Sequence, residues 1–158
     1  MPLDTKSFDL HRTLPLSAER LWHVLTDAKE REKWSGPDAT TLLETDTADL
    51  RVGGQDRHRF GPVDAPEFLV ETRWYDLTEA ERAVFTETLI FGGEAVSTSL
   101  VTYVLDGKDN QTELGITVAV SSFSGPEALN EIKQGWAGGL DNLTAYTQAL
   151  GQPTCSTL

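Results

Sequence analysis

Two residues in the middle of the chain, Glu87 and His58, have side chains that could move protons. Each lies in a segment predicted to be a β-strand, in which every second side chain points to the same face. If Glu87 pointed into an apolar cavity, burial would raise the pKa of its carboxyl group, and His58 could exchange protons with it or with a ligand. Such a pair could remove a proton next to a carbonyl group and so assist a cyclisation or a dehydration.

A structural interpretation of the same two residues competes with catalysis and is favoured. Glu87 could be a solvated edge residue or form an ion pair with Arg59 or Arg73, and His58 could fill a polar rim. Single charged side chains on apolar strand faces are more often satisfied structurally than catalytic. Catalysis by Glu87 and His58 is therefore an alternative hypothesis.

The sequence carries no motif for a metal, a phosphate group or a serine nucleophile. The three histidines, His11, His23 and His58, lack close ligand spacing, and the single cysteine, Cys155, lies near the C-terminus. The segment 52–54 (Val-Gly-Gly) lacks the Gly-Lys-Ser/Thr ending of a phosphate-binding loop, and no Gly-x-Ser-x-Gly sequence occurs. We expect no metal site and no cofactor.

Length and charge limit the class of protein further. The chain has 158 residues and a mass of 17.4 kDa, which fits one domain with a sizeable core. A net charge of −12 disfavours binding to nucleic acids and to anionic membranes. The single cysteine rules out an internal disulfide, and no apolar run fits a signal peptide or a membrane span. We expect a cytoplasmic single domain over 1–158, with a core at about 8–150 and a flexible tail at 151–158.

The first elements that must position these side chains are a strand and two helices. Alternation predicts a strand over Ser7–Leu14. Ser17 is a good N-cap for a helix with one apolar face, on which Trp22 is expected in the core. Asp27 and Glu30 form a second capping box, which starts a short charged helix that ends near Trp34 and is stopped by residues 35–37 (Ser-Gly-Pro).

The middle of the chain has the pattern of an antiparallel meander. Its segments are separated by short connections with turn chemistry, such as Gly92-Gly93 and Asp109-Asn110. Short connections favour antiparallel pairing over parallel units with crossover helices. The predicted strands are Thr40–Thr45, Asp49–Val52, Gln55–Phe60, Glu67–Tyr75, Arg82–Phe91, Ser97–Leu105 and Thr112–Ser121.

A long helix is predicted after the last strand. Ser124 and Glu127 form a capping box, and an apolar stripe continues from there to Leu150. Gly139 falls on this stripe, where a leucine facing the core would be expected. Either the sheet backbone approaches closely at this point, or the glycine leaves space that something else fills. Close packing is favoured, because empty apolar volume lowers stability.

The apolar faces of these elements suggest where a small molecule could bind. Ligand pockets are mostly apolar with a few polar anchors, although the same side chains could simply form core. The candidate ligand-binding residues combine the apolar set of each strand, the end of the short helix and the stripe of the long helix. They are Trp34, Phe60, Val70, Trp74, Phe85, Glu87, Tyr103, Ile116, Ile132, Trp136, Gly139 and Leu140.

Four segments together resemble a known family. They are LPLSAERLWHVLTDAKEREKW with the following Gly36-Pro37, RVGG at 51–54, ERAVFTETL at 81–89 and GWAGGLDNLTAY at 135–146. Their order is similar to that of the START-like (SRPBCC) helix-grip superfamily, and within it to the family named after the activator of the heat-shock-protein-90 ATPase (its C-terminal domain). The resemblance covers about residues 8–150.

The resemblance implies an α+β helix-grip fold. In this fold a curved antiparallel β-sheet meander wraps around a long C-terminal helix, two short helices follow the first strand, and an apolar cavity lies between helix and sheet. Bacterial members are thought to bind hydrophobic ligands, and relatives include aromatic polyketide cyclases and lipid-transfer domains. The eukaryotic namesake also uses a separate N-terminal domain to engage its chaperone, so a direct chaperone partner is not expected here.

Three hypotheses follow for the function. The first is a cytoplasmic protein that binds a small hydrophobic molecule between helix and sheet. The second is an enzyme of the cyclase or dehydratase type that uses Glu87 and His58. The third is a stress-linked chaperone-interaction module that acts through its surface. We expect no nucleic-acid partner and no membrane insertion, and a homodimer is one assembly that the sequence allows.

Overall fold

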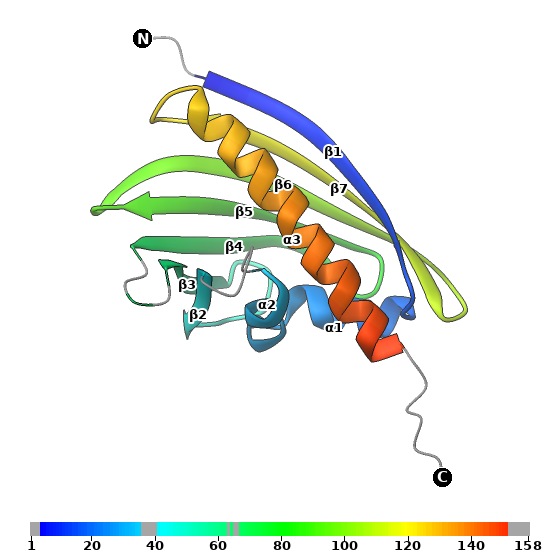
Figure 1. Ribbon diagram of the computed structural model, residues 1–158. Helices are drawn as coiled ribbons and strands as arrows, with labels where there is room; N and C mark the ends of the chain where they lie inside the picture. The colour runs from blue at the N-terminus through cyan, green and yellow to red at the C-terminus, as the bar shows by residue number, and fades with distance from the viewer. Residues whose placement is uncertain (1–3, 36–40, 63, 65–66, 152–158) are drawn as a thin grey trace.

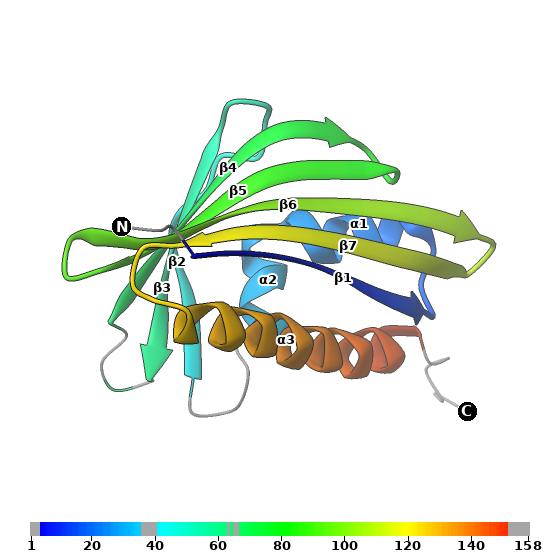
Figure 2. The ribbon, with the colours of Figure 1, turned by 90° about the horizontal axis from the view of Figure 1, so that it is seen from above.

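The computed structural model describes residues 4–35, 41–62, 64 and 67–151. One seven-stranded antiparallel sheet carries all the strands, in the order β1-β7-β6-β5-β4-β3-β2. The long helix α3 crosses one face of this sheet diagonally (Figure 1), and the sheet curves over it when seen from above (Figure 2). The predicted α+β helix-grip architecture is confirmed.

The strands are close to the predicted ranges. Residues with positive φ angles make the tight hairpin turns, including Gly92 (62°) and Gly93 (84°) after β5 and Asp109 (60°) after β6. Ala80, also with positive φ, lies between β4 and β5. The bounds are β1 Asp4–Leu14, β2 Thr41–Thr47, β3 Gln55–Pro62, β4 Phe68–Thr78, β5 Arg82–Phe91, β6 Glu94–Lys108 and β7 Gln111–Ser122.

The predicted strand Asp49–Val52 is wrong. This segment forms the connection between β2 and β3, because its backbone groups bond locally: the Arg51 N–H donates to the Asp49 carbonyl (3.0 Å) and the Gly54 N–H to the Arg51 carbonyl (2.7 Å). The Asp49 N–H donates to the buried Asp56 carboxylate at 2.8 Å. No row of ladder bonds remains for a strand over these residues.

Two short helices follow β1, as predicted. In α1, Ala18–Thr26, the Ser17 hydroxyl accepts a hydrogen bond from the Arg20 N–H at 3.3 Å. In α2, Ala28–Trp34, the Asp27 carboxylate accepts from the Glu30 N–H at 3.1 Å. Both predicted N-caps are confirmed.

The helix α3 spans Glu127–Gly151 and buries its apolar stripe through Leu140 and Leu143. It begins at Glu127, so Ser124 is not its N-cap. The Ser124 hydroxyl instead lies 3.5 Å from the Val96 carbonyl. The predicted capping box at this end is therefore wrong, although the helix itself is confirmed.

The core lies between α3, α1 and the inner face of the central strands. Its fully buried side chains come from every layer, which ties the two short helices to the sheet and to α3. They include Leu14, Leu21, Leu25, Trp74, Phe85, Leu114, Ile116, Leu140 and Leu143.

Some predictions fall on residues that the structure does not describe. The stop at Gly36-Pro37, Cys155 and the tail after Gly151 lie outside the described residues. None of the described helices is long and apolar enough to cross a membrane. Among the described side chains, no group of three or more His, Cys, Asp or Glu is placed to hold a metal ion.

Candidate functional site

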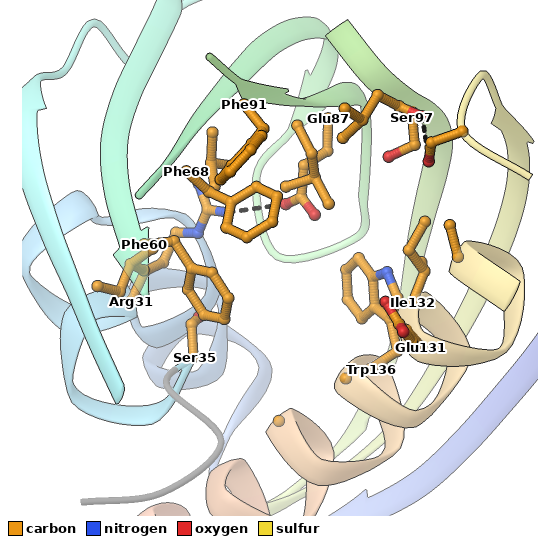
Figure 3. Close-up of a pocket in the computed structure, with 18 of the residues that line it drawn as sticks. Arg31, Ser35, Phe60, Phe68, Glu87, Phe91, Ser97, Glu131, Ile132 and Trp136 are labelled. Atoms are coloured by element: carbon orange, nitrogen blue, oxygen red, sulfur yellow. Dashed lines mark hydrogen bonds and ion pairs between the residues drawn. The ribbon is translucent and has the colours of Figure 1, made fainter. Parts of the chain in front are cut away.

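A pocket of about 490 Å³ lies between α3, the end of α2 and strands β2 to β6. Its volume falls in the range of sites that take small organic molecules. Figure 3 shows its walls: aromatic side chains of the strands face the side chains of α3 across the hollow.

Aromatic side chains from three neighbouring strands form one wall of the pocket. Phe60 of β3, Phe68 of β4 and Phe91 of β5 line it, and the rings of Phe68 and Phe91 lie 5.1 Å apart. Strand register places them together, because Phe60 pairs with Phe68 and Phe68 pairs with Phe91. Ile132 and Trp136 of α3 lie on the opposite side (Figure 3).

The glycines of α3 leave space on this opposite side. Gly135 and Gly139 both line the pocket, and a Cβ atom added at either would meet no other heavy atom within 4 Å, beyond its chain neighbours and the helix's own backbone. The favoured prediction of close packing at Gly139 is therefore wrong. The glycine is buried, but it faces the hollow and not the sheet backbone.

A buried arginine, Arg31, lines the pocket. Arg31 of α2 is only 4% exposed, and its guanidinium lies about 6 Å from the ring centres of Trp74 (6.0 Å) and Phe85 (5.9 Å). Its NH2 lies 3.5 Å from the Glu87 carboxylate, and its NH1 lies 3.9 Å from the Asp56 carboxylate and 3.5 Å from the Thr72 hydroxyl. Each of these distances is 3.5 Å or more, so the guanidinium group makes no short hydrogen bond to these three residues.

Glu87 lines the pocket beside this arginine. Burial raises the pKa of its carboxyl group, and the nearby Arg31 guanidinium acts in the opposite direction. The side chain keeps 20% of its surface exposed. The predicted partners, Arg59 and Arg73, lie elsewhere: Arg59 pairs with Asp46 at 3.0 Å, and Arg73 lies over the Tyr75 ring. The ion-pair prediction was right about the interaction and wrong about the partner.

Two hydroxyl groups lie on the same polar side. Tyr103 and Ser97 of β6 line the pocket, and the Ser97 hydroxyl has no hydrogen-bond partner among the described residues. Burial raises the pKa of the Tyr103 phenol, and the Glu87 carboxylate also raises it, against the effect of Arg31. The phenol therefore stays protonated at neutral pH and can donate.

His58 is buried beneath the pocket and not on its wall. Its side chain is 0% exposed, and neither ring nitrogen has a hydrogen-bond partner in the described structure. The Ala28 backbone is near enough to favour the protonated ring but is not placed for a hydrogen bond. Burial, helped by the Arg31 charge, lowers the pKa of His58 to about 4, so the ring is neutral at pH 7. The structure does not bring His58 and Glu87 together at the pocket.

The candidate ligand-binding residues fall into two groups. Eight of them line the pocket: Trp34, Phe60, Val70, Glu87, Tyr103, Ile132, Trp136 and Gly139. The other four are buried in the core behind it: Trp74, Phe85, Ile116 and Leu140. Alternation is correct for the three strand residues and the helical stripe for Leu140, but neither pattern says where along an element the cavity begins.

Several lining residues were missed, and Arg31 matters most among them. A signal for it was present: Ala28, Arg31 and Trp34 are three residues apart, so they share one face of α2. An arginine on the face that buries a tryptophan needs a buried partner. Leu43, Phe68, Leu89, Phe91, Val96, Ser97, Ser124, Ala128, Glu131, Gly135 and Ser35 also line the pocket.

Comparison with protein families gives one match over most of the chain. The family described as "Activator of Hsp90 ATPase homolog 1-like protein" matches residues 15–148. No curated protein matches the sequence significantly.

Solved structures with the same fold are found as well. The chain is similar to the Mll3558 protein from Rhizobium loti, with 28% identity and a TM-score of 0.77 over 92% of this chain and 99% of that one. An uncharacterised protein from Rhizobium leguminosarum has 20% identity and a TM-score of 0.80 over 94% and 97% of the two chains. Protein CV1439 from Chromobacterium violaceum has 22% identity and a TM-score of 0.75 over 89% and 96%. The last two show the fold alone.

Proposed function

Because the chain belongs to the family of Activator of Hsp90 ATPase homolog 1-like proteins, whose fold often serves as a hydrophobic-ligand-binding domain, we propose that it binds a small hydrophobic molecule. The binding site is the pocket between α3 and the sheet. Its aromatic side, formed by Phe60, Phe68 and Phe91, would contact the apolar body of the ligand.

The observation that carries this proposal is the open space at Gly139. Helix α3 is apolar along its inner stripe, yet at this position it has no side chain and nothing within 4 Å takes its place. Glycine inside a helix lowers stability by about 1 kcal/mol relative to alanine, and an unfilled apolar hollow lowers it further. A bound apolar ligand would recover packing contacts that the protein alone leaves unmade.

A dye titration with a blocked variant tests the proposal. The uncharged dye phenylnaphthylamine fluoresces in apolar sites, and we expect it to bind the wild-type protein. Gly139→Leu should weaken this binding by about tenfold or more, because the new side chain occupies the hollow; tenfold corresponds to about 1.4 kcal/mol. The matched control is Ala145→Leu, which adds a leucine to an exposed position of α3 away from the pocket.

The dye titration has two opposite outcomes. Loss of dye binding in Gly139→Leu, with binding retained in Ala145→Leu, would support a site in the pocket. Equal affinity in wild type and Gly139→Leu would contradict it. Unfolding curves of both variants check that each is folded, and we expect Gly139→Leu to fold because its Cβ atom would meet no non-local heavy atom within 4 Å.

Catalysis by Glu87 and His58 is not part of this proposal. A general base or acid must reach the proton that it transfers. Glu87 lines the pocket and meets this condition, but His58 is fully buried and is not among the lining residues. The second member of the predicted pair therefore has no access to a ligand in the pocket.

A further inference from the structure

Polar side chains from three elements interrupt the largely apolar lining of the pocket. Arg31, Glu87, Ser97 and Tyr103 line it from α2, β5 and β6, and we call this set the polar wall. In Figure 3, Glu87 lies between Arg31, which is on the side of Phe60 and Phe68, and Ser97. A binding site for a purely apolar molecule has no need of such a wall, because each buried polar group without a partner lowers stability.

Much of the hydrogen-bonding capacity of the polar wall is unused. Ser97 is 1% exposed and its hydroxyl has no partner in the described structure. Tyr103, which is also buried, adds a phenol group to the lining. Glu87 uses only its Oε2 atom, toward Arg31 at 3.5 Å, which leaves Oε1 as a free acceptor among the described residues. A buried group such as the Ser97 hydroxyl is normally satisfied, which is consistent with a ligand group that completes its hydrogen bonding.

The charges of the polar wall indicate which chemical group of a ligand it would accept. Among the described residues, Arg31 is the one cation that lines the pocket, and it already faces two carboxylates, Glu87 at 3.5 Å and Asp56 at 3.9 Å. With both carboxylates ionised the three groups carry one excess negative charge. Glu131, which is exposed on α3, adds another acidic group at the pocket. A carboxylate ligand would therefore be repelled, because the acidic groups at the site exceed the single positive charge of Arg31.

From this arrangement we propose that the ligand is an apolar, ring-containing molecule with one O–H or N–H donor at its end, and that the pocket discriminates against carboxylates. The inference rests on the proposed binding function and specifies its ligand class. Glu87 Oε1 accepts the hydrogen bond from the donor, Ser97 and Tyr103 offer further polar contacts, and the rings of Phe60, Phe68 and Phe91 hold the apolar body.

Three probes with the same ring system test the discrimination. They are naphthylmethanol, naphthylmethylamine and naphthoate, substituted at the same ring position, and each displaces phenylnaphthylamine from the protein at pH 7. We expect the alcohol and the amine to bind at least about tenfold more tightly than the carboxylate. In Glu87→Gln we expect the carboxylate to gain affinity relative to the alcohol, because the repelling charge is gone while Arg31 remains. Glu113→Gln, an exposed substitution on β7, is the control and should leave the order unchanged.

The outcomes distinguish the ligand class from the binding function. The ligand class would be overturned if naphthoate bound as tightly as naphthylmethanol. It would also be overturned if Glu87→Gln did not reduce the preference for the alcohol over the carboxylate. Either result would leave the binding function intact. Failure of all three probes and of the dye to bind would contradict the binding function, and the ligand class with it. Circular dichroism confirms that Glu87→Gln is folded; if it is not, Ser97→Ala replaces it, and unchanged affinity for the alcohol would then count against the polar wall.

Discussion

The Arg31 guanidinium lies 3.5 Å from the Glu87 carboxylate and 3.9 Å from that of Asp56. The short helix α2 thereby places its one buried cation between β3 and β5, which are not neighbours in the sheet. Thr72 of β4, the strand between them, is the third contact, at 3.5 Å. These three contacts hold α2 against the inner face of the sheet. Arg31 and Glu87 form part of the polar wall of the pocket.

Removing this cation should destabilise the protein strongly. Arg31→Met leaves the buried Asp56 and the largely buried Glu87 without a compensating charge, and the loss of one partner of a buried pair typically costs about 3–5 kcal/mol. Urea unfolding at pH 7 measures the change in the free energy of unfolding. Arg57→Met is the matched control, since Arg57 forms an exposed pair with Glu71 at 2.6 Å. We expect the control to cost less than about 1 kcal/mol, and equal losses in both variants would refute the structural role of Arg31.

Acid sensitivity should depend on His58. The pKa of this buried ring is about 4 in the folded protein, against 6.5 for an ordinary histidine. Between these values the unfolded chain binds a proton that the folded chain does not, so stability is complete above pH 6.5 and falls as the pH drops toward 4. The whole shift corresponds to about 3 kcal/mol as an order of magnitude.

Replacing His58 by an apolar residue of similar size should remove this loss. We expect His58→Leu to be at least as stable as the wild type at pH 7, because neither ring nitrogen has a hydrogen-bond partner in the described structure. Its stability should fall less than that of the wild type between pH 6.5 and pH 4. The exposed His11→Gln serves as the control. Parallel stability curves for wild type and His58→Leu across this window would show that the ring is not held neutral.

Alanine at Gly139 should stabilise the protein. A Cβ atom meets no non-local heavy atom there, so the substitution gains helix propensity of up to about 1 kcal/mol without a clash. Gly54→Ala is the contrasting variant, because its Cβ would collide with the Asp49 carbonyl oxygen and should destabilise the protein. Thermal unfolding of the two variants compares them directly. A destabilised Gly139→Ala would mean that the space at α3 is not open.

The fold could be predicted largely because its signals are local. Ser17 and Asp27 cap the helices where the sequence predicted, and Arg82–Phe91 has the predicted bounds. The predicted strand Asp49–Val52 failed because its backbone groups bond within the segment and to the Asp56 carboxylate seven residues further on, and not to a neighbouring strand. Alternation of side chains does not reveal where backbone hydrogen bonds go.

The site was predictable only in part, for the same reason. Alternation placed Phe60 and Glu87 on the inner face, and both line the pocket. Alternation alone could not separate the pocket wall from the core behind it, where Trp74 lies, because both share the same side of the sheet. The partner of Glu87 was missed because Arg31 comes from a helix 56 residues away in the chain.

An NMR titration can show residue by residue whether a small molecule binds between α3 and the sheet. Naphthylmethanol is added to the ¹⁵N-labelled protein while the backbone amides and tryptophan indoles are followed. We predict shift changes concentrated at Gly135 and Gly139 and at the Trp136 indole, with little change at Leu100 and Val104, which are exposed and do not line the pocket. Changes confined to Leu100 and Val104, or no change at millimolar probe, would contradict the account.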